Sequence, residues 1–177
     1  MRRLPWIIVL LVLALTLACG EEEQEPAEEA APEKTPQEIA EEKAPIAVET
    51  ANELLGAVQK ADKAKVLDMC FRDISTVSEQ LGLTDEEIAE SRVQQEAQLA
   101  LFESFWKEMV LSKAYVIQGW TEPVVADIAP AADHPELVVY LTVTDVSYVL
   151  NGEEMTEAGK TVVIFNLGDY WFAQWPY

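Results

Sequence analysis

The chain has 177 residues, of which 32 are acidic and 12 are basic, and its formal net charge at pH 7 is −20. This length suits one domain with additional segments and is short for a multidomain protein. Because an acidic chain with few Lys and Arg side chains is repelled by phosphates, nucleic acids and anionic lipid head groups are not expected as partners.

The first segment has the features of an export signal. Met1, Arg2 and Arg3 form a short basic start, and an apolar run follows from Leu4 to Ala18. A helix of this run would rise about 22 Å, which is short of the roughly 30 Å hydrocarbon core of a bilayer. A signal peptide over residues 1–18 is therefore expected in preference to a permanent transmembrane helix.

The apolar run ends in Leu15-Thr16-Leu17-Ala18-Cys19-Gly20, which resembles the lipobox of bacterial lipoproteins. In those proteins the cysteine thiol receives diacylglycerol and the signal peptidase cuts before it. The resemblance implies a lipid anchor on Cys19, and two or more acyl chains such as palmitate suffice for stable attachment to a membrane. We therefore expect an extracytoplasmic protein of the bacterial cell envelope, on the outer membrane or cell surface. The alternative is an ordinary secretory signal with an incidental cysteine.

Residues 19–45 are expected to be the lipidated cysteine and a disordered acidic linker. Between Gly20 and Pro45 there are ten Glu, four Pro and a single large aliphatic residue, Ile39. This composition cannot bury enough apolar surface to fold by itself. A capping box at Thr35 and Glu38 favours transient helix near its end. The linker would hold a domain of residues 46–177 clear of the lipid.

The domain opens with helical patterns. The first helix presents one apolar face, formed by Ala47, Val48, Ala51, Leu54, Leu55 and Val58. Asp62 can cap a short second helix that runs to about Phe71. Within it, Cys70 is the one thiol left after lipidation, so no disulfide is possible, and its apolar neighbours favour an inert buried thiol.

Thr84 and Glu87 form a capping box that starts a long helix reaching about Leu111. The apolar face of this helix moves midway, so a kink or two different packing partners are expected. The first stripe consists of small apolar side chains, Ala89, Val93, Ala97 and Ala100. The second stripe is larger and mainly aromatic, Phe102, Phe105, Trp106 and Met109.

From Tyr115 onward the apolar residues alternate, which predicts strands. In the strand from Leu137 to Leu150 the alternation shifts by one residue at Thr144 and Asp145, which indicates a β-bulge and a curved sheet. Asn151-Gly152 predicts a tight turn. The other expected segments are strands at Tyr115–Trp120 and Val124–Ile128, an irregular stretch at Glu153–Lys160, and strands at Thr161–Leu167 and Tyr170–Trp175.

This order of elements, together with Gly168-Asp169-Tyr170-Trp171-Phe172 near the end, resembles the NTF2-like superfamily and, within it, small bacterial lipoproteins. The resemblance covers about Ala47 to Trp175. It implies an α+β fold, an NTF2-like (cystatin-like) cone in which helices pack in a strongly curved antiparallel sheet. It also implies a pocket at the wide mouth of the cone, which some relatives use for catalysis and many only for binding.

Four aromatic residues with a polar atom are the candidate lining of that pocket: Trp106, Trp120, Tyr140 and Trp171. The alternative is that these side chains belong to the core. The favoured function is a membrane-tethered binding or interaction domain whose ligand is unknown, with a small apolar molecule or another envelope protein as its partner.

The second function is a small enzyme of the ketosteroid-isomerase or hydratase type. It would use a pocket carboxylate such as Asp127 with Tyr140 as hydrogen-bond donor, whereas Asp145 is expected to face outward at the bulge. His134 lies in a loop and has no second histidine or cysteine to complete a metal site or a triad. We therefore expect no metal, no cofactor and no catalytic residue that the sequence alone identifies.

Overall fold

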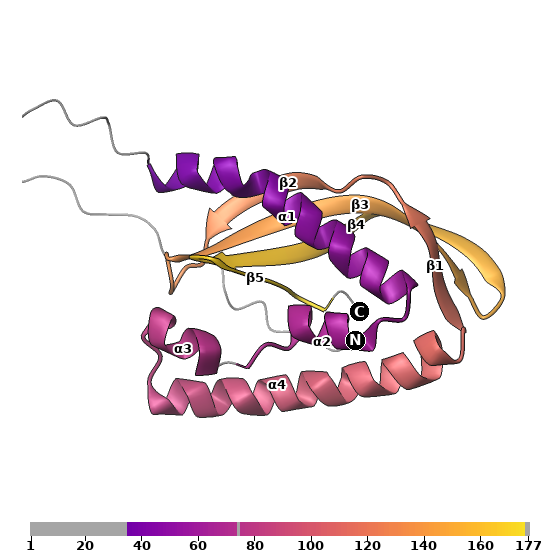
Figure 1. The fold of residues 1–177 in the computed structure, drawn as a ribbon, viewed down its shortest axis with the longest axis horizontal. Helices are drawn as coiled ribbons and strands as arrows, with labels where there is room; N and C mark the ends of the chain where they lie inside the picture. Colours follow the sequence, from indigo (N-terminus) through magenta and orange to yellow (C-terminus); the bar gives the residue numbers. More distant parts are fainter. Residues whose placement is uncertain (1–34, 74, 176–177) are drawn as a thin grey trace, which may run out of the picture.

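The computed structural model describes residues 35–73 and 75–175, which form an α+β domain (Figure 1). The predicted signal peptide, Cys19 and the first part of the predicted linker lie outside the described residues. Within the described part, no helix combines the length and the apolar character that a membrane span needs. The elements are α1 Pro36–Gln59, α2 Lys63–Cys70, α3 Ser75–Leu81, α4 Asp85–Phe105, the π-helix η1 Trp106–Leu111, β1 Tyr115–Trp120, β2 Val124–Pro130, β3 Leu137–Leu150, β4 Glu153–Leu167 and β5 Tyr170–Ala173.

The strands form one strongly curved antiparallel sheet. Its order is β1-β3-β4-β5, and β2 also pairs with β3. β1 pairs with the C-terminal half of β3 and β2 pairs with the N-terminal half, so that β1 and β2 share one edge of the sheet. α1 packs along the sheet and contacts every strand, while α4 lies on the far side of α2 and α3 (Figure 1). This arrangement confirms the α+β class and the curved sheet.

The register of the long hairpin shifts where the bulge was predicted, between Thr144 and Val146, but the extra residue lies on β4 and not on β3. Thr144 pairs with Lys160 and Val146 pairs with Glu157, so two residues of β4 lie opposite Asp145. The buried alternation along β3 continues without a shift through this point, so the predicted bulge within β3 is wrong. The Thr144 hydroxyl donates to the Thr121 carbonyl at 2.5 Å, and the Asp145 carboxylate accepts from the Gly159 N–H at 2.8 Å. Gly159 has a φ of 66°, a conformation that favours glycine. These contacts hold the bend in the long hairpin, and Asp145 is exposed there, as expected.

The first helix begins at Pro36, so the end of the predicted linker belongs to the folded domain. Thr35 and Glu38 form the predicted capping box, with the Thr35 N–H donating to the Glu38 carboxylate at 2.8 Å. Farther along, the Lys43 ammonium donates to the Asn166 amide oxygen at 3.1 Å. The glutamate-rich composition suggested disorder, but contacts with the sheet supply the stabilisation that the segment lacks by itself.

The predicted irregular stretch from Glu153 to Lys160 is wrong, because β4 runs without interruption from Glu153 to Leu167. The turn at Asn151 and Gly152 has the positive φ values, 51° and 90°, that a tight hairpin needs. Pairing with the second half of β3 orders this stretch, although its own side chains are mostly exposed. The sequence analysis also missed α3, and the last strand ends at Ala173 instead of Trp175.

The core lies between α1, the sheet and the end of α4. The apolar face predicted for α1 is confirmed, and Asp62 caps α2 as expected, accepting from the Lys65 N–H. Fully buried large side chains include Leu54, Leu55, Val66, Phe102, Trp106, Tyr140, Val146, Val162 and Ile164.

The long helix changes character where its apolar face was predicted to move. α4 passes directly into η1 at Trp106, and the wider π-helical turn accounts for the rotation of the apolar face. The aromatic stripe is packed, since Phe102 and Trp106 are buried. The stripe of small apolar side chains is exposed, and 67% of the surface of Val93 is accessible. The described residues therefore supply no second packing partner for this stripe.

Candidate functional site

Two of the four predicted pocket residues are core residues. Trp106 is 1% exposed, and its ring centroid lies 5.3 Å from that of Phe102. Tyr140 is fully buried, and its hydroxyl donates to the Ala40 carbonyl of α1 at 3.0 Å. Burial raises the pKa of Tyr140 above its usual range. For both residues the alternative interpretation, that they belong to the core, holds.

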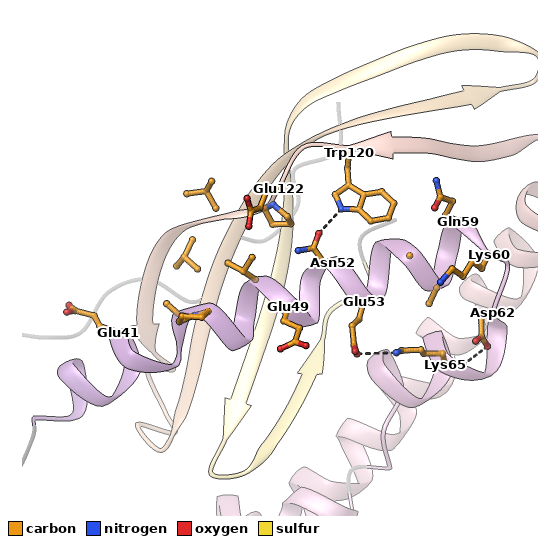
Figure 2. A pocket seen from close by; sticks show the side chains of 18 residues that line it. Glu41, Glu49, Asn52, Glu53, Gln59, Lys60, Asp62, Lys65, Trp120 and Glu122 are labelled. Carbon is orange, nitrogen blue, oxygen red and sulfur yellow. Dashed lines mark hydrogen bonds and ion pairs between the residues drawn. The ribbon is translucent and has the colours of Figure 1, made fainter.

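Trp171 is half-buried on β5, with its ring centroid 5.4 Å from that of Tyr140. The structure therefore places Trp171 against a core ring. Trp120, at the end of β1, lies elsewhere, because it forms a wall of a groove beside α1 (Figure 2). The four predicted residues do not converge on one pocket.

The groove has a volume of about 1210 Å³ and lies between α1 and the edge that β1 and β2 share. One wall is a single face of α1, and the start of α2 continues it. The other wall is the end of β1, the loop after it and the start of β2. The lining residues are Glu41, Ala44, Pro45, Val48, Glu49, Asn52, Glu53, Gly56, Ala57, Gln59, Lys60, Asp62, Lys65, Trp120, Glu122, Pro123, Val124 and Val125.

The indole of Trp120 is held over α1 by two features of the helix. Its Nε1 donates to the Asn52 Oδ1 at 2.7 Å (Figure 2). A Cβ added at Gly56 would lie 3.9 Å from the Cη2 atom of Trp120, which is an ordinary contact distance. Because Gly56 has no side chain, the ring of Trp120 lies close to the helix backbone there. The hydrogen bond satisfies the polar atom of the ring and leaves its apolar part available in the groove.

Charged side chains are distributed unevenly along the groove. The Lys65 ammonium is 3.2 Å from the Glu53 carboxylate, and Asp62 accepts the N–H that caps α2. Glu41 and Lys60 lie at opposite ends of the labelled helix face (Figure 2). Such a groove can bind a long ligand that combines apolar and charged groups.

The structure does not bring together the carboxylate and tyrosine of the enzyme hypothesis. Asp127 pairs with Leu141 while Ile128 pairs with Tyr140, so Asp127 and Tyr140 project from opposite faces of the sheet. The exposed Asp127 carboxylate accepts from the Ile128 N–H at 2.9 Å.

The structure also describes the surroundings of two other candidate reactive groups, His134 and Cys70. The His134 Nδ1 atom lies 3.4 Å from the Glu136 Oε1 atom in the loop between β2 and β3. Burial raises the pKa of the Cys70 thiol to about 12, so the reactive thiolate is scarce at neutral pH. Within residues 35–73 and 75–175, no group of three or more His, Cys, Asp or Glu side chains could hold a metal ion.

Asn52, Gly56 and Glu122 are site residues that the sequence analysis missed. Asn52 and Gly56 are spaced four residues apart on one face of α1, and Glu49 lies on the same face. Polar side chains at helical spacing are typical of a solvated helix face. This face becomes a groove wall because the edge of the sheet lies beside it.

No protein-family model, curated protein or solved structure matches this chain.

Proposed function

We propose that this chain is a lipid-anchored, extracytoplasmic protein of the bacterial cell envelope whose domain binds an elongated amphipathic ligand. The observation that carries the binding function is the groove beside α1, with Trp120 held in its wall by Asn52. Its volume of about 1210 Å³ is larger than is usual for small-molecule pockets. The proposed ligand is therefore long.

The length of the groove supports the same conclusion. Its lining on α1 extends from Glu41 to Lys60, a distance of about 28 Å along a helix axis. An extended peptide of about eight residues covers that distance. A compact metabolite would contact only part of the lining.

We further propose that the domain is an NTF2-like cone. The strongly curved antiparallel sheet that packs on α1, and the order of helices before strands, support this assignment. The proposed binding site lies between α1 and the edge formed by β1 and β2. Of the four residues expected to line a pocket, Trp106, Trp120, Tyr140 and Trp171, this groove includes Trp120 and none of the other three.

The lipid anchor is tested by Cys19→Ser. Because acylation requires the thiol, we expect the wild-type mature chain to begin at Cys19 and to carry the mass of the acyl chains, and the variant to lack that mass. Intact-mass analysis and membrane fractionation of the two chains measure this. A wild-type chain that begins elsewhere, or that carries no acyl mass, would contradict the lipoprotein assignment.

Binding in the groove is tested by Gly56→Leu in the full exported chain. The added side chain projects from the helix face beneath Trp120 and fills the slot that glycine leaves open. With Nile red as an uncharged apolar probe, we expect the fluorescence increase seen with the wild-type chain to fall at least about fivefold. Native mass spectrometry of the same chains detects any molecule that co-purifies.

The matched control is Ala100→Leu, which adds an apolar side chain on the exposed face of α4. This variant should bind Nile red as the wild-type chain does, because it lies outside the groove lining. If Gly56→Leu is folded and binds the probe as well as the control, the groove is not the binding site.

A further inference from the structure

The α1 groove combines apolar side chains from both walls with carboxylates along its length. The apolar lining comes from both walls: Ala44, Pro45, Val48 and Ala57 on α1, and Trp120, Pro123, Val124 and Val125 on the sheet side. Val124 is 61% exposed. An occupant that covers these side chains removes apolar surface from water, which is the main favourable contribution to binding.

The charges of the groove favour a basic occupant. Lys65 is paired with Glu53, so the ammonium that remains in the lining is that of Lys60. Glu41 and Glu49 on α1 and Glu122 on the sheet side supply carboxylates (Figure 2). The formal charge of the whole chain, −20, has the same sign and therefore attracts a cationic partner toward the groove.

The neighbouring sheet edge disfavours binding by strand addition. Pro123 precedes β2 and Pro130 ends it, and neither can donate a backbone hydrogen bond. The Ile128 N–H is already bonded to the Asp127 carboxylate, and the Gln118 carbonyl of β1 accepts from Gln59 at 3.1 Å. An occupant is therefore expected to bind through its side chains.

On these observations, and resting on the proposed function, we infer that the α1 groove binds an extended basic segment of a partner protein. Its apolar side chains lie against Trp120 and Val48, and its Lys or Arg side chains lie beside Glu41, Glu49 and Glu122. An extended chain presents alternate residues to opposite sides. One segment can therefore direct its apolar side chains toward Trp120 and Val48 and its cationic side chains toward the carboxylates. The acidic lining also disfavours a fatty acid, whose carboxylate would be repelled.

The test uses the full exported chain carrying Cys19→Ser, so that acyl groups do not compete for the groove. The probe is a fluorescein-labelled peptide of ten residues that alternates Lys with Val. Matched peptides carry Ser or Glu in place of every Lys. Fluorescence anisotropy should show that the Lys peptide binds at least about tenfold more tightly than the Ser peptide, because exposed ion pairs each contribute a factor of about two to five. The Glu peptide should not bind measurably.

Charge variants separate the groove from the general field of the protein. The triple variant Glu41→Gln, Glu49→Gln, Glu122→Gln should weaken binding of the Lys peptide at least about tenfold. A control triple variant, Glu90→Gln, Glu96→Gln, Glu154→Gln, removes the same charge at exposed positions outside the groove. It should change the affinity by less than about twofold. Equal effects of the two triple variants overturn the inference, since binding would then follow net charge alone.

The test also distinguishes this inference from the proposed function. In one outcome, Nile red or the Ser peptide binds the wild-type chain but not Gly56→Leu, and the Lys peptide binds no more tightly than the Ser peptide. The inference is then wrong and the proposed function stands. If folded Gly56→Leu excludes none of the probes, both are wrong. Preferential binding of the Lys peptide that both Gly56→Leu and the groove triple variant abolish supports both.

Discussion

Trp106→Ala is expected to lower the free energy of unfolding by about 3 to 5 kcal/mol, the usual cost of truncating a large buried ring. Trp106 is 1% exposed, and its ring packs against those of Phe102 and Trp175, with centroids 5.3 and 6.4 Å away. Because a domain has a typical stability of about 5 to 15 kcal/mol, this loss is a large part of the total. Urea unfolding of the exported chain measures it.

The matched variant is Trp106→Phe, which keeps an aromatic ring in the same place. The Trp106 indole N–H has no hydrogen-bond partner within the part of the chain that the structure describes. An unpaired buried donor costs about 1 to 3 kcal/mol, so its removal offsets part of the packing lost with the smaller ring. We therefore expect Trp106→Phe to cost less than about 1.5 kcal/mol.

Two outcomes would contradict this account of the core. A loss below about 1 kcal/mol for Trp106→Ala would mean that the ring is not packed in the folded chain. A loss for Trp106→Phe as large as that for Trp106→Ala would mean that the indole N–H makes an important bond. In either case the interface between the end of α4 and the sheet would differ from the one described.

The sequence predicted those features of the fold that depend on short-range signals. The strand Tyr115–Trp120 and the turn at Asn151 each follow from a local pattern of alternation or turn residues, and each is confirmed. The start of α1 and the first half of β4 depend instead on pairing with other elements. Lys43 bonds to Asn166, which is far away in the sequence, and the first half of β4 pairs with β3 across the hairpin, from Glu153 opposite Leu150 onward. Composition alone shows neither pairing and so misjudged both segments.

The candidate site was predicted less well, for a related reason. Aromatic character identified Trp120, but it also selected Trp106 and Tyr140, which are core residues. Alternation along a strand shows which residues share a face, yet it does not show which face meets an open cavity. Glu49 and Asn52 have the spacing of a solvated helix face, and only the position of β2 beside α1 turns that face into a groove wall.

Raising the pH above 9 is expected to destabilise the folded chain through Cys70. Burial raises the pKa of this thiol from 9.0 to about 12. Because the folded pKa is higher than the unfolded one, the stabilising contribution is fully present below pH 9 and is lost as the pH rises toward 12. At about pH 11 the loss should reach about 2 kcal/mol. Urea unfolding at a series of pH values measures it.

The control for the alkaline transition is Cys70→Ala, which has no thiol to ionise. This variant should be less stable at neutral pH, because it leaves a small cavity where the Cys70 side chain packs against the hydrophobic core. Its free energy of unfolding should nevertheless fall less steeply than that of the wild-type chain between pH 9 and about pH 11. Tyr140, whose pKa burial raises from 10.0, contributes in the same direction in both chains and so cancels in the comparison. Equal slopes for the two chains would show that the folded domain leaves the Cys70 thiol in water, and rapid alkylation of Cys70 by iodoacetamide at neutral pH would show the same.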